Sequence, residues 1–321
     1  MLIPTISGPT FQSEISVSLF ASSPVVAKRA LEFFTTQIHN DHTRRAYMQA
    51  MRTFSAWCEA KRIAELSQVE PIHVAAYIKE LGQHRAAPTV KQHLAALRML
   101  FDWLVTGHVL QINPAHAVRG PKYVVKKGKT PVLTAEEARA LLDSISSASL
   151  VGLRDRALIG VMTYTFARIN AVVELKGKDY YVQGRRGWVH LREKGGKEYD
   201  VPCHHTLERF LDEYISAAQI EGHAEAPLFR TLAGRTGALT SNGLAQQDAY
   251  RMVQRRAKAA GLRTRIGNHT FRATGITAYL KNGGSLEMAQ HIAGHESPRT
   301  TKLYDRRREE ISLDEVERIA I

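Results

Sequence analysis

The chain has 321 residues, of which 44% are hydrophobic, and no apolar run approaches the roughly 18 residues that a membrane span needs. No basic stretch precedes an apolar one at the start, and the two cysteines, Cys58 and Cys203, lack neighbours at metal-ligand spacing, so we expect no signal peptide and a reducing cytoplasm. Lysine and arginine outnumber aspartate and glutamate by 44 to 31. The resulting net charge of +13 favours a polyanionic partner, nucleic acid first, although solubility alone also selects for charge.

The N-terminal part of the sequence predicts an arm followed by a helical bundle. Residues 1–24 are rich in Ser, Thr and Pro, which is typical of a loosely ordered arm. Residues 25–118 have apolar side chains at helical spacing in four segments. The second segment is capped near Asp41, and the third and fourth begin at Pro71 and Pro88. We therefore expect a four-helix domain. The charge excess of the chain makes this domain a candidate for binding DNA.

Basic residues lie on the polar faces of this bundle and continue beyond it. Taken alone, a charged face is most often only solvated. Residues 119–131 combine two prolines, two glycines and five basic residues, which is the composition of a linker. Two basic domains joined by such a linker could close around a duplex as a clamp. The predicted DNA contacts are Arg44, Arg45, Lys91, Arg98, Lys122, Lys126, Lys127 and Arg255.

Residues 132–305 predict a second domain that mixes helices with a small sheet. A capping box at Thr134 begins one helix, and residues 153–164 form a strongly apolar one. Short strand-like runs separated by turns lie within residues 179–202, whereas residues 234–242 read as a turn-rich loop. The predicted fold class is mainly α with a small antiparallel β-sheet.

The tail, residues 306–321, has apolar residues that could form one edge, among them Ile311, Leu313 and Val316. So short a tail cannot bury that edge by itself. We expect it to pack on its own domain or, in an assembly, on a neighbouring protomer.

One stretch, residues 268–304, concentrates the polar groups that indicate chemistry. His269 and Arg272 are three residues apart, so they share a face of a helix, which an Asn-Gly-Gly sequence then ends. His295 follows the end of the next helix, and Tyr304 comes nine residues later. These four side chains could converge on one phosphate.

Further candidates lie earlier in the chain. Arg168 follows the apolar helix at a turn, and Lys194 lies at the tip of a hairpin with the sequence KGGKE, where Lys197 is an alternative. Each candidate also has an ordinary structural explanation, such as a helix cap, a solvated turn or a core side chain. The pairs His204-His205 and His39 with His42 lack further ligands nearby, so we expect no metal site.

The order and spacing of these motifs resemble a tyrosine recombinase of the phage integrase family. The resemblance extends from about residue 25 to residue 304, and five matches in order are far more specific than any one of them. The sequence departs from that family around its arginines: Phe166-Ala167 replace the usual Gly-Leu, Ala171 stands where an acidic residue is frequent, and Ala273 replaces a histidine. The nearest acidic residue in sequence is Glu174.

The resemblance implies a transesterification at a DNA phosphodiester in which the Tyr304 hydroxyl attacks phosphorus and forms a 3′-phosphotyrosyl link. It further implies that Arg168, Arg272 and His295 stabilise the transition state, that Lys194 protonates the departing 5′-oxygen, and that His269 acts near the tyrosine proton. Neither a metal nor a nucleotide cofactor is expected. The implied partners are double-stranded DNA, a homo-tetramer on that DNA and DNA-bending accessory proteins, in the cytoplasm at the nucleoid.

Two alternatives remain open on the sequence. The same groups would serve a nicking and closing enzyme similar to type IB topoisomerases, which needs no paired sites. The departures around the arginines would also suit a DNA-binding protein of the same fold with weakened catalysis.

Overall fold

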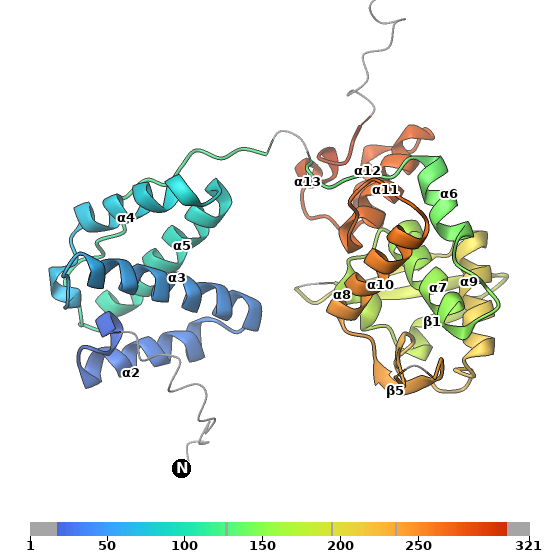
Figure 1. Ribbon diagram of the computed structural model, residues 1–321, viewed down its shortest axis with the longest axis horizontal. Coiled ribbons are helices and arrows are strands. Elements are labelled where there is room, and N and C mark those ends of the chain that lie inside the picture. The colour runs from blue at the N-terminus through green and yellow to red at the C-terminus, as the bar shows by residue number, and fades with distance from the viewer. Residues whose placement is uncertain (1–17, 126–127, 194, 235, 307–321) are drawn as a thin grey trace, which may run out of the picture. The chain divides into compact units, whose positions relative to one another are not determined.

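The computed structural model describes residues 18–125, 128–193, 195–234 and 236–306, and it divides into two compact units, Met1–Val124 and Val125–Ile321 (Figure 1). Each unit has a hydrophobic core of its own. In these described ranges, no helix is both long enough and apolar enough to cross a membrane.

From residue 18 onward, where the structure describes it, the first unit is a bundle of four α-helices. Its helices are α2 (Pro24–Glu32, continued by a π-helical turn, Phe33–Gln37), α3 (Asp41–Ala60), α4 (Pro71–His84) and α5 (Ala87–Thr106). The Asn40 side chain accepts two backbone N–H groups at the start of α3, and Pro71 and Pro88 occupy first-turn positions, where a missing N–H costs nothing. The four predicted helices are confirmed.

The core of this unit extends further toward the N-terminus than the sequence predicted. The short 3₁₀-helix η1 (Ser18–Ala21) places Leu19 and Phe20 in the core, and they are 1% and 0% exposed. The amide of Leu19 donates to the Ser55 hydroxyl at 3.2 Å. The prediction of a loose arm over residues 1–24 is therefore wrong for this turn, because burying two large apolar side chains outweighs the entropy of ordering it. Residues 1–17 lie outside the described ranges.

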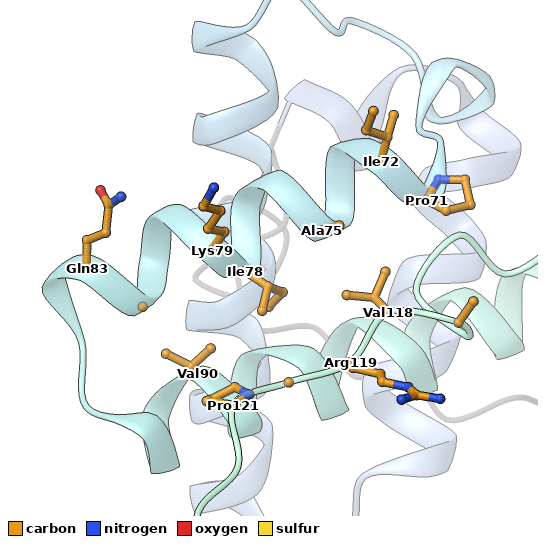
Figure 2. Close-up of a pocket in the computed structure, with 13 residues that line it drawn as sticks. Pro71, Ile72, Ala75, Ile78, Lys79, Gln83, Val90, Val118, Arg119 and Pro121 are labelled. Atoms are coloured by element: carbon orange, nitrogen blue, oxygen red, sulfur yellow. The ribbon is translucent and has the colours of Figure 1, made fainter.

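A groove of about 800 Å³ runs along α4 and is lined by Ile72, Ile78, Val90 and the chain leaving the bundle at residues 117–121 (Figure 2). Arg98 fixes this exit segment to α5. Its Nε donates to the Ala115 carbonyl at 3.2 Å, and its Nη2 donates to the Val118 carbonyl. The exit path is thus set by charge-assisted hydrogen bonds as well as by packing.

The second unit combines helices with two small antiparallel sheets. The first sheet has the order β1-β2-β3, and the second pairs β4 with β5. The strands are β1 (Tyr180–Gln183), β2 (Arg186–Glu193), β3 (Lys197–Pro202), β4 (Arg230–Leu232) and β5 (Leu239–Gly243). The first sheet was predicted. The second was missed because β5, which overlaps the predicted loop 234–242, is short and largely polar, and this hides the alternation of a strand.

The helices of the second unit run from α6 to α13. They are α6 (Ala135–Asp143), α7 (Leu150–Tyr164), α8 (Ile169–Val173), α9 (His205–Ala217), α10 (Gln246–Ala259), α11 (Asn268–Lys281), α12 (Leu286–Ile292) and α13 (Pro298–Lys302). Helix α7 is the central one, and it packs against both α9 and α11. Gly275 allows α11 to approach closely, because a Cβ there would overlap the Thr163 carbonyl oxygen and lie 2.9 Å from the Phe166 ring.

Candidate active site

The turn between α7 and α8 sets the position of Arg168. Phe166 adopts the left-handed conformation, with φ of 56°, and Arg168 follows as the N-cap residue of α8. A left-handed residue other than glycine costs roughly 1–2 kcal/mol. Burial of the Phe166 ring, packed edge-on to Tyr279 with centroids 6.1 Å apart, offsets this cost. The turn also directs the Phe166 carbonyl toward Arg272.

Arg272 lies almost wholly inside the second unit, with 1% of its surface exposed. Its Nη1 donates to the Phe166 carbonyl and its Nη2 to the Ala293 carbonyl, the latter at 2.6 Å. The buried Nε has no hydrogen-bond partner among the described residues. Burying a charged group costs free energy unless the group is paired and hydrogen-bonded. The two carbonyl contacts offset part of this cost, and they also hold the guanidinium in one place.

Glu193, the last residue of β2, joins the two arginines. Its carboxylate is 2% exposed and forms an ion pair with Nη1 of Arg168. The Arg168 backbone N–H donates to Oε1 of the same carboxylate at 3.3 Å, and Nη1 of Arg272 lies 3.8 Å from Oε1. The end of a strand thus fixes a guanidinium from α8 beside one from α11.

Tyr304 lies among these groups and is 8% exposed. Its hydroxyl is 2.6 Å from Nε2 of His269, and its ring stacks on that of His295, with centroids 5.7 Å apart and planes 6° apart. Thr277 donates to the Tyr304 carbonyl at 2.9 Å, which ties the end of α13 to α11. His295 is held in turn by Thr301, whose hydroxyl lies 2.9 Å from Nδ1.

Burial and positive charge together control the protonation of the site. Burial, with the charges of Arg272 and Arg168, lowers the pKa of His295 to about 3, and the same causes lower the pKa of His269. Both imidazoles are therefore neutral at pH 7. Burial raises the pKa of Tyr304 above its usual value, and the two arginines oppose that rise. The phenol is protonated and next to a neutral base.

The structure brings five of the six predicted catalytic residues into one connected cluster. His269, Arg272, His295 and Tyr304 are in mutual reach, and Arg168 joins them through Glu193. Lys194 lies outside the described residues. Lys197 begins β3, its Nζ is 5.9 Å from the Tyr199 ring centroid, and its charge contributes to the lowered pKa of His295.

The carboxylate of Glu193 was missed on the sequence. Glu174, the acidic residue expected to be nearest Arg168, is exposed at the end of α8. A signal for Glu193 was present, since β2 alternates and Val189 and Leu191 point to the core, so Glu193 falls on the buried face. Thr277 and Thr301 carried no comparable signal.

The predicted DNA contacts differ in how far their side chains are already engaged. Arg44 donates to the Phe34 and Ile38 carbonyls at 3.0 and 2.7 Å, Arg98 holds the exit segment, and Arg255 pairs with buried Asp155 at 3.0 Å. These three arginines have structural roles. Arg45, Lys91 and Lys122 are exposed, whereas Lys126 and Lys127 lie outside the described residues. A role in DNA contact stays a prediction for all eight.

Comparison with known proteins identifies the class. Residues 131–310 match the phage integrase family, and residues 34–108 match its N-terminal SAM-like domain. The chain therefore belongs to the phage integrase family, and the predicted enzyme class, a tyrosine site-specific recombinase, is confirmed. The predicted fold class is confirmed as well.

Individual relatives are distant but similar over most of their length. Tyrosine recombinase XerC of Thermodesulfovibrio yellowstonii is 28% identical over 272 residues, which cover 83% of this chain and 85% of that protein. XerD of Listeria monocytogenes is 26% identical over 269 residues, covering 82% and 87%.

Solved structures share the fold. The XerH recombinase in a post-cleavage complex with palindromic difH substrate has a TM-score of 0.69 at 21% identity, covering 97% of this chain and 92% of that one. A lambda integrase tetramer bound to a Holliday junction has a TM-score of 0.66 at 19% identity, covering 97% and 84%.

Proposed function

We propose that this recombinase cuts and rejoins double-stranded DNA through a covalent phosphotyrosyl intermediate. In the first step, Oη of Tyr304 bonds to phosphorus, the bond from phosphorus to the 5′-oxygen breaks, and that oxygen leaves as a hydroxyl. A 5′-hydroxyl from another strand reverses the step and joins new ends. The observation that carries this proposal is the 2.6 Å approach of the Tyr304 hydroxyl to His269 beside buried Arg272.

Neutral His269 suits the role of general base. A phenol with a raised pKa is a poor nucleophile until its proton is removed, and an imidazole at hydrogen-bond distance can accept that proton. Because burial, together with the positive charge of Arg272, lowers the pKa of His269, the base remains unprotonated at neutral pH. The proton therefore passes from Tyr304 Oη to His269 Nε2 as the bond to phosphorus forms.

The arginines are suited to the charge that develops on the non-bridging phosphate oxygens. Guanidinium groups donate paired hydrogen bonds in a fixed plane, and a preorganised donor typically contributes about 3 kcal/mol to lowering such a barrier. Arg168 keeps a side chain that is 40% exposed, so its guanidinium is accessible to DNA. Neutral His295 adds an Nε2–H donor when Thr301 donates its hydroxyl hydrogen to Nδ1.

The departing 5′-oxygen needs an acid, and we propose Lys194 for it on the sequence motif alone. Lys197 is the alternative from the other side of the same turn. Replacing each lysine by alanine in turn distinguishes the two. In a DNA whose departing 5′-oxygen is replaced by sulfur, the sulfur leaves without needing a proton. The variant that lacks the acid should therefore cleave this DNA at the wild-type rate, and the other variant should gain nothing from the sulfur.

Trapping the intermediate tests the proposal. A DNA site nicked next to the scissile phosphate loses the short 5′-hydroxyl strand after attack, so the adduct accumulates as an SDS-stable protein–DNA band. We expect the band with the wild-type chain and its loss in Tyr304→Phe. The matched control is Tyr279→Phe, a tyrosine of α11 outside the cluster, which should form the band normally. A band that persists in Tyr304→Phe would refute the assignment of the nucleophile.

We further propose a homo-tetramer acting on two DNA sites at the nucleoid. The lambda integrase tetramer on a Holliday junction has the same fold, which supports the proposal. The tail, residues 306–321, would dock on a neighbouring protomer; from residue 307 onward it lies outside the described residues.

Removal of the chain from Ile311 onward is expected to leave DNA binding intact and to reduce assembly of the tetramer. Binding is measured by gel shift on one site, and assembly by sedimentation with two sites. Exchange of strands between two marked duplexes separates recombination from simple nicking and closing. Unchanged recombination by the shortened chain would contradict docking of the tail in an assembly.

A further inference from the structure

The carboxylate of Glu193 contacts the two arginines of the site, and these contacts are not part of the pairing of the sheet. It is the last residue of β2, on the buried face of the strand, yet its neighbours are cationic groups from α8 and α11. It receives both the backbone N–H and the guanidinium of Arg168, so it fixes that residue at two points. Two-point attachment restrains both the direction and the rotation of the arginine.

Charge balance around Arg272 also depends on this group. Arg272 is 1% exposed, and its other partners are the carbonyls of Phe166 and Ala293, which carry no net charge. The second guanidinium, that of Arg168, pairs with the other oxygen, Oε2, of the same carboxylate. Glu193 is therefore the anion that allows two like charges to lie close together before any phosphate is bound.

Other acidic groups nearby are already engaged elsewhere. Asp179 accepts both Nη groups of Arg192, and Glu198 lies near Arg192 and His190 on the outer side of the hairpin. On α8, position 171, one turn after Arg168, is a buried alanine. Helix α8 thus offers no acid to its own arginine, and the strand supplies it.

We infer that Glu193 is a positioning residue for the recombinase reaction, which orients Arg168 and holds it beside Arg272. The two guanidiniums are thereby kept at a fixed separation before the phosphate binds. This inference rests on the proposed function. Because Glu193 is the last residue of β2, the same carboxylate also anchors the end of that strand. The sheet and the two arginine-bearing helices are thereby joined at one side chain.

The kinetic test compares Glu193→Gln, Glu193→Asp and a matched control, Glu198→Gln, in the same hairpin. The glutamine keeps the size of the side chain but loses the charge. We expect the rate of adduct formation on a saturating nicked site to fall about 100-fold, the loss typical of a displaced catalytic group, with DNA affinity unchanged. Aspartate should recover part of the rate, and the control should match the wild type. Equal rates in Glu193→Gln and wild type would overturn the inference.

A purely structural role is distinguished by melting temperature and affinity. If the glutamine variant lost rate, DNA affinity and melting temperature together, and aspartate recovered none of them, Glu193 would serve folding rather than positioning. Loss of rate alone supports the inference.

A second readout needs no catalysis. The Nη1–H group of Arg168, which donates to Glu193 and is assigned by its loss in Arg168→Lys, is expected to give a slowly exchanging nitrogen–proton NMR signal in wild type and Glu193→Asp. In Glu193→Gln the signal should be lost to exchange with water. Its persistence there would overturn the inference even if no DNA site had been found. Absence of any adduct from the wild type, with this NMR difference present, would instead count against the proposed function alone.

Discussion

Around Tyr304, burial decides which side chains carry a charge. His295 is buried beside two arginines, so it is much harder to protonate in the folded protein than in the unfolded chain. A histidine with a depressed pKa contributes stability above its ordinary pKa of 6.5, and this stability is lost as pH falls toward its folded pKa of about 3. His269 adds to the effect in the same direction.

The unfolding free energy is therefore expected to fall on acidification below pH 6.5, by up to about 1.4 kcal/mol per pH unit for each proton that only the unfolded chain binds. His295→Gln should flatten this dependence, whereas replacement of exposed His39 by glutamine should not. Denaturant unfolding between pH 7.5 and 4.5 measures both. An equal slope in His295→Gln and the wild type would show that His295 does not cause the loss.

Sequence reasoning found the residues of the site that carry a motif and missed the one that joins them. His269, Arg272, His295 and Tyr304 lie within one stretch, so local spacing was enough to group them. The pairing of Glu193 with Arg168 connects a strand with a helix 25 residues apart in sequence, and spacing alone gives no sign of it. Only the alternation along β2 would have placed this acid inward.

At the level of helices and strands, the site depends on how closely α11 lies to α7. Gly275 is the point of approach, and the space that a methyl group would need is filled by the Thr163 carbonyl and the Phe166 ring. A displaced α11 would carry His269 and Arg272 with it. Helix boundaries followed from caps and prolines in the sequence, whereas this contact did not, because a glycine within a helical pattern does not reveal its neighbour.

Gly275→Ala is accordingly expected to destabilise the second unit by about 1–3 kcal/mol and to slow adduct formation, because the added methyl group forces α11 and α7 apart. The control is Gly82→Ala in α4, where nothing lies within 4 Å of the new Cβ. That change should be neutral or stabilise by up to about 1 kcal/mol. Thermal unfolding of both variants measures the difference, and a native melting temperature in Gly275→Ala would contradict the proposed close contact.

For the molecule as a whole, the chain divides into two units with separate cores, and every described member of the cluster around Tyr304 belongs to the second. The linker composition of residues 119–131 indicated a boundary in this region, and the division falls at Val124. The extent of the first unit was harder to predict, because Leu19 and Phe20 lie in a segment whose composition resembles a loose arm.

A chain that begins at Val125 is therefore expected to fold, with the near-ultraviolet circular dichroism of a packed core, and to keep the cluster around Tyr304. Its affinity for DNA should fall by at least about tenfold, and the slope of log affinity against log salt should become shallower, because cationic contacts of the first unit are lost. Gel shifts at several salt concentrations measure this. A fragment with native affinity and an unchanged salt slope would show that the first unit contributes nothing to binding.

The left-handed turn at Phe166 sets limits on how this enzyme can be varied. In a library randomised at that codon and selected for activity, glycine and asparagine should be recovered well ahead of valine and isoleucine, whose branched Cβ atoms resist positive φ. Glycine clones would forgo the aromatic contact with Tyr279, so second-site changes that enlarge a side chain near Tyr279 should accompany them.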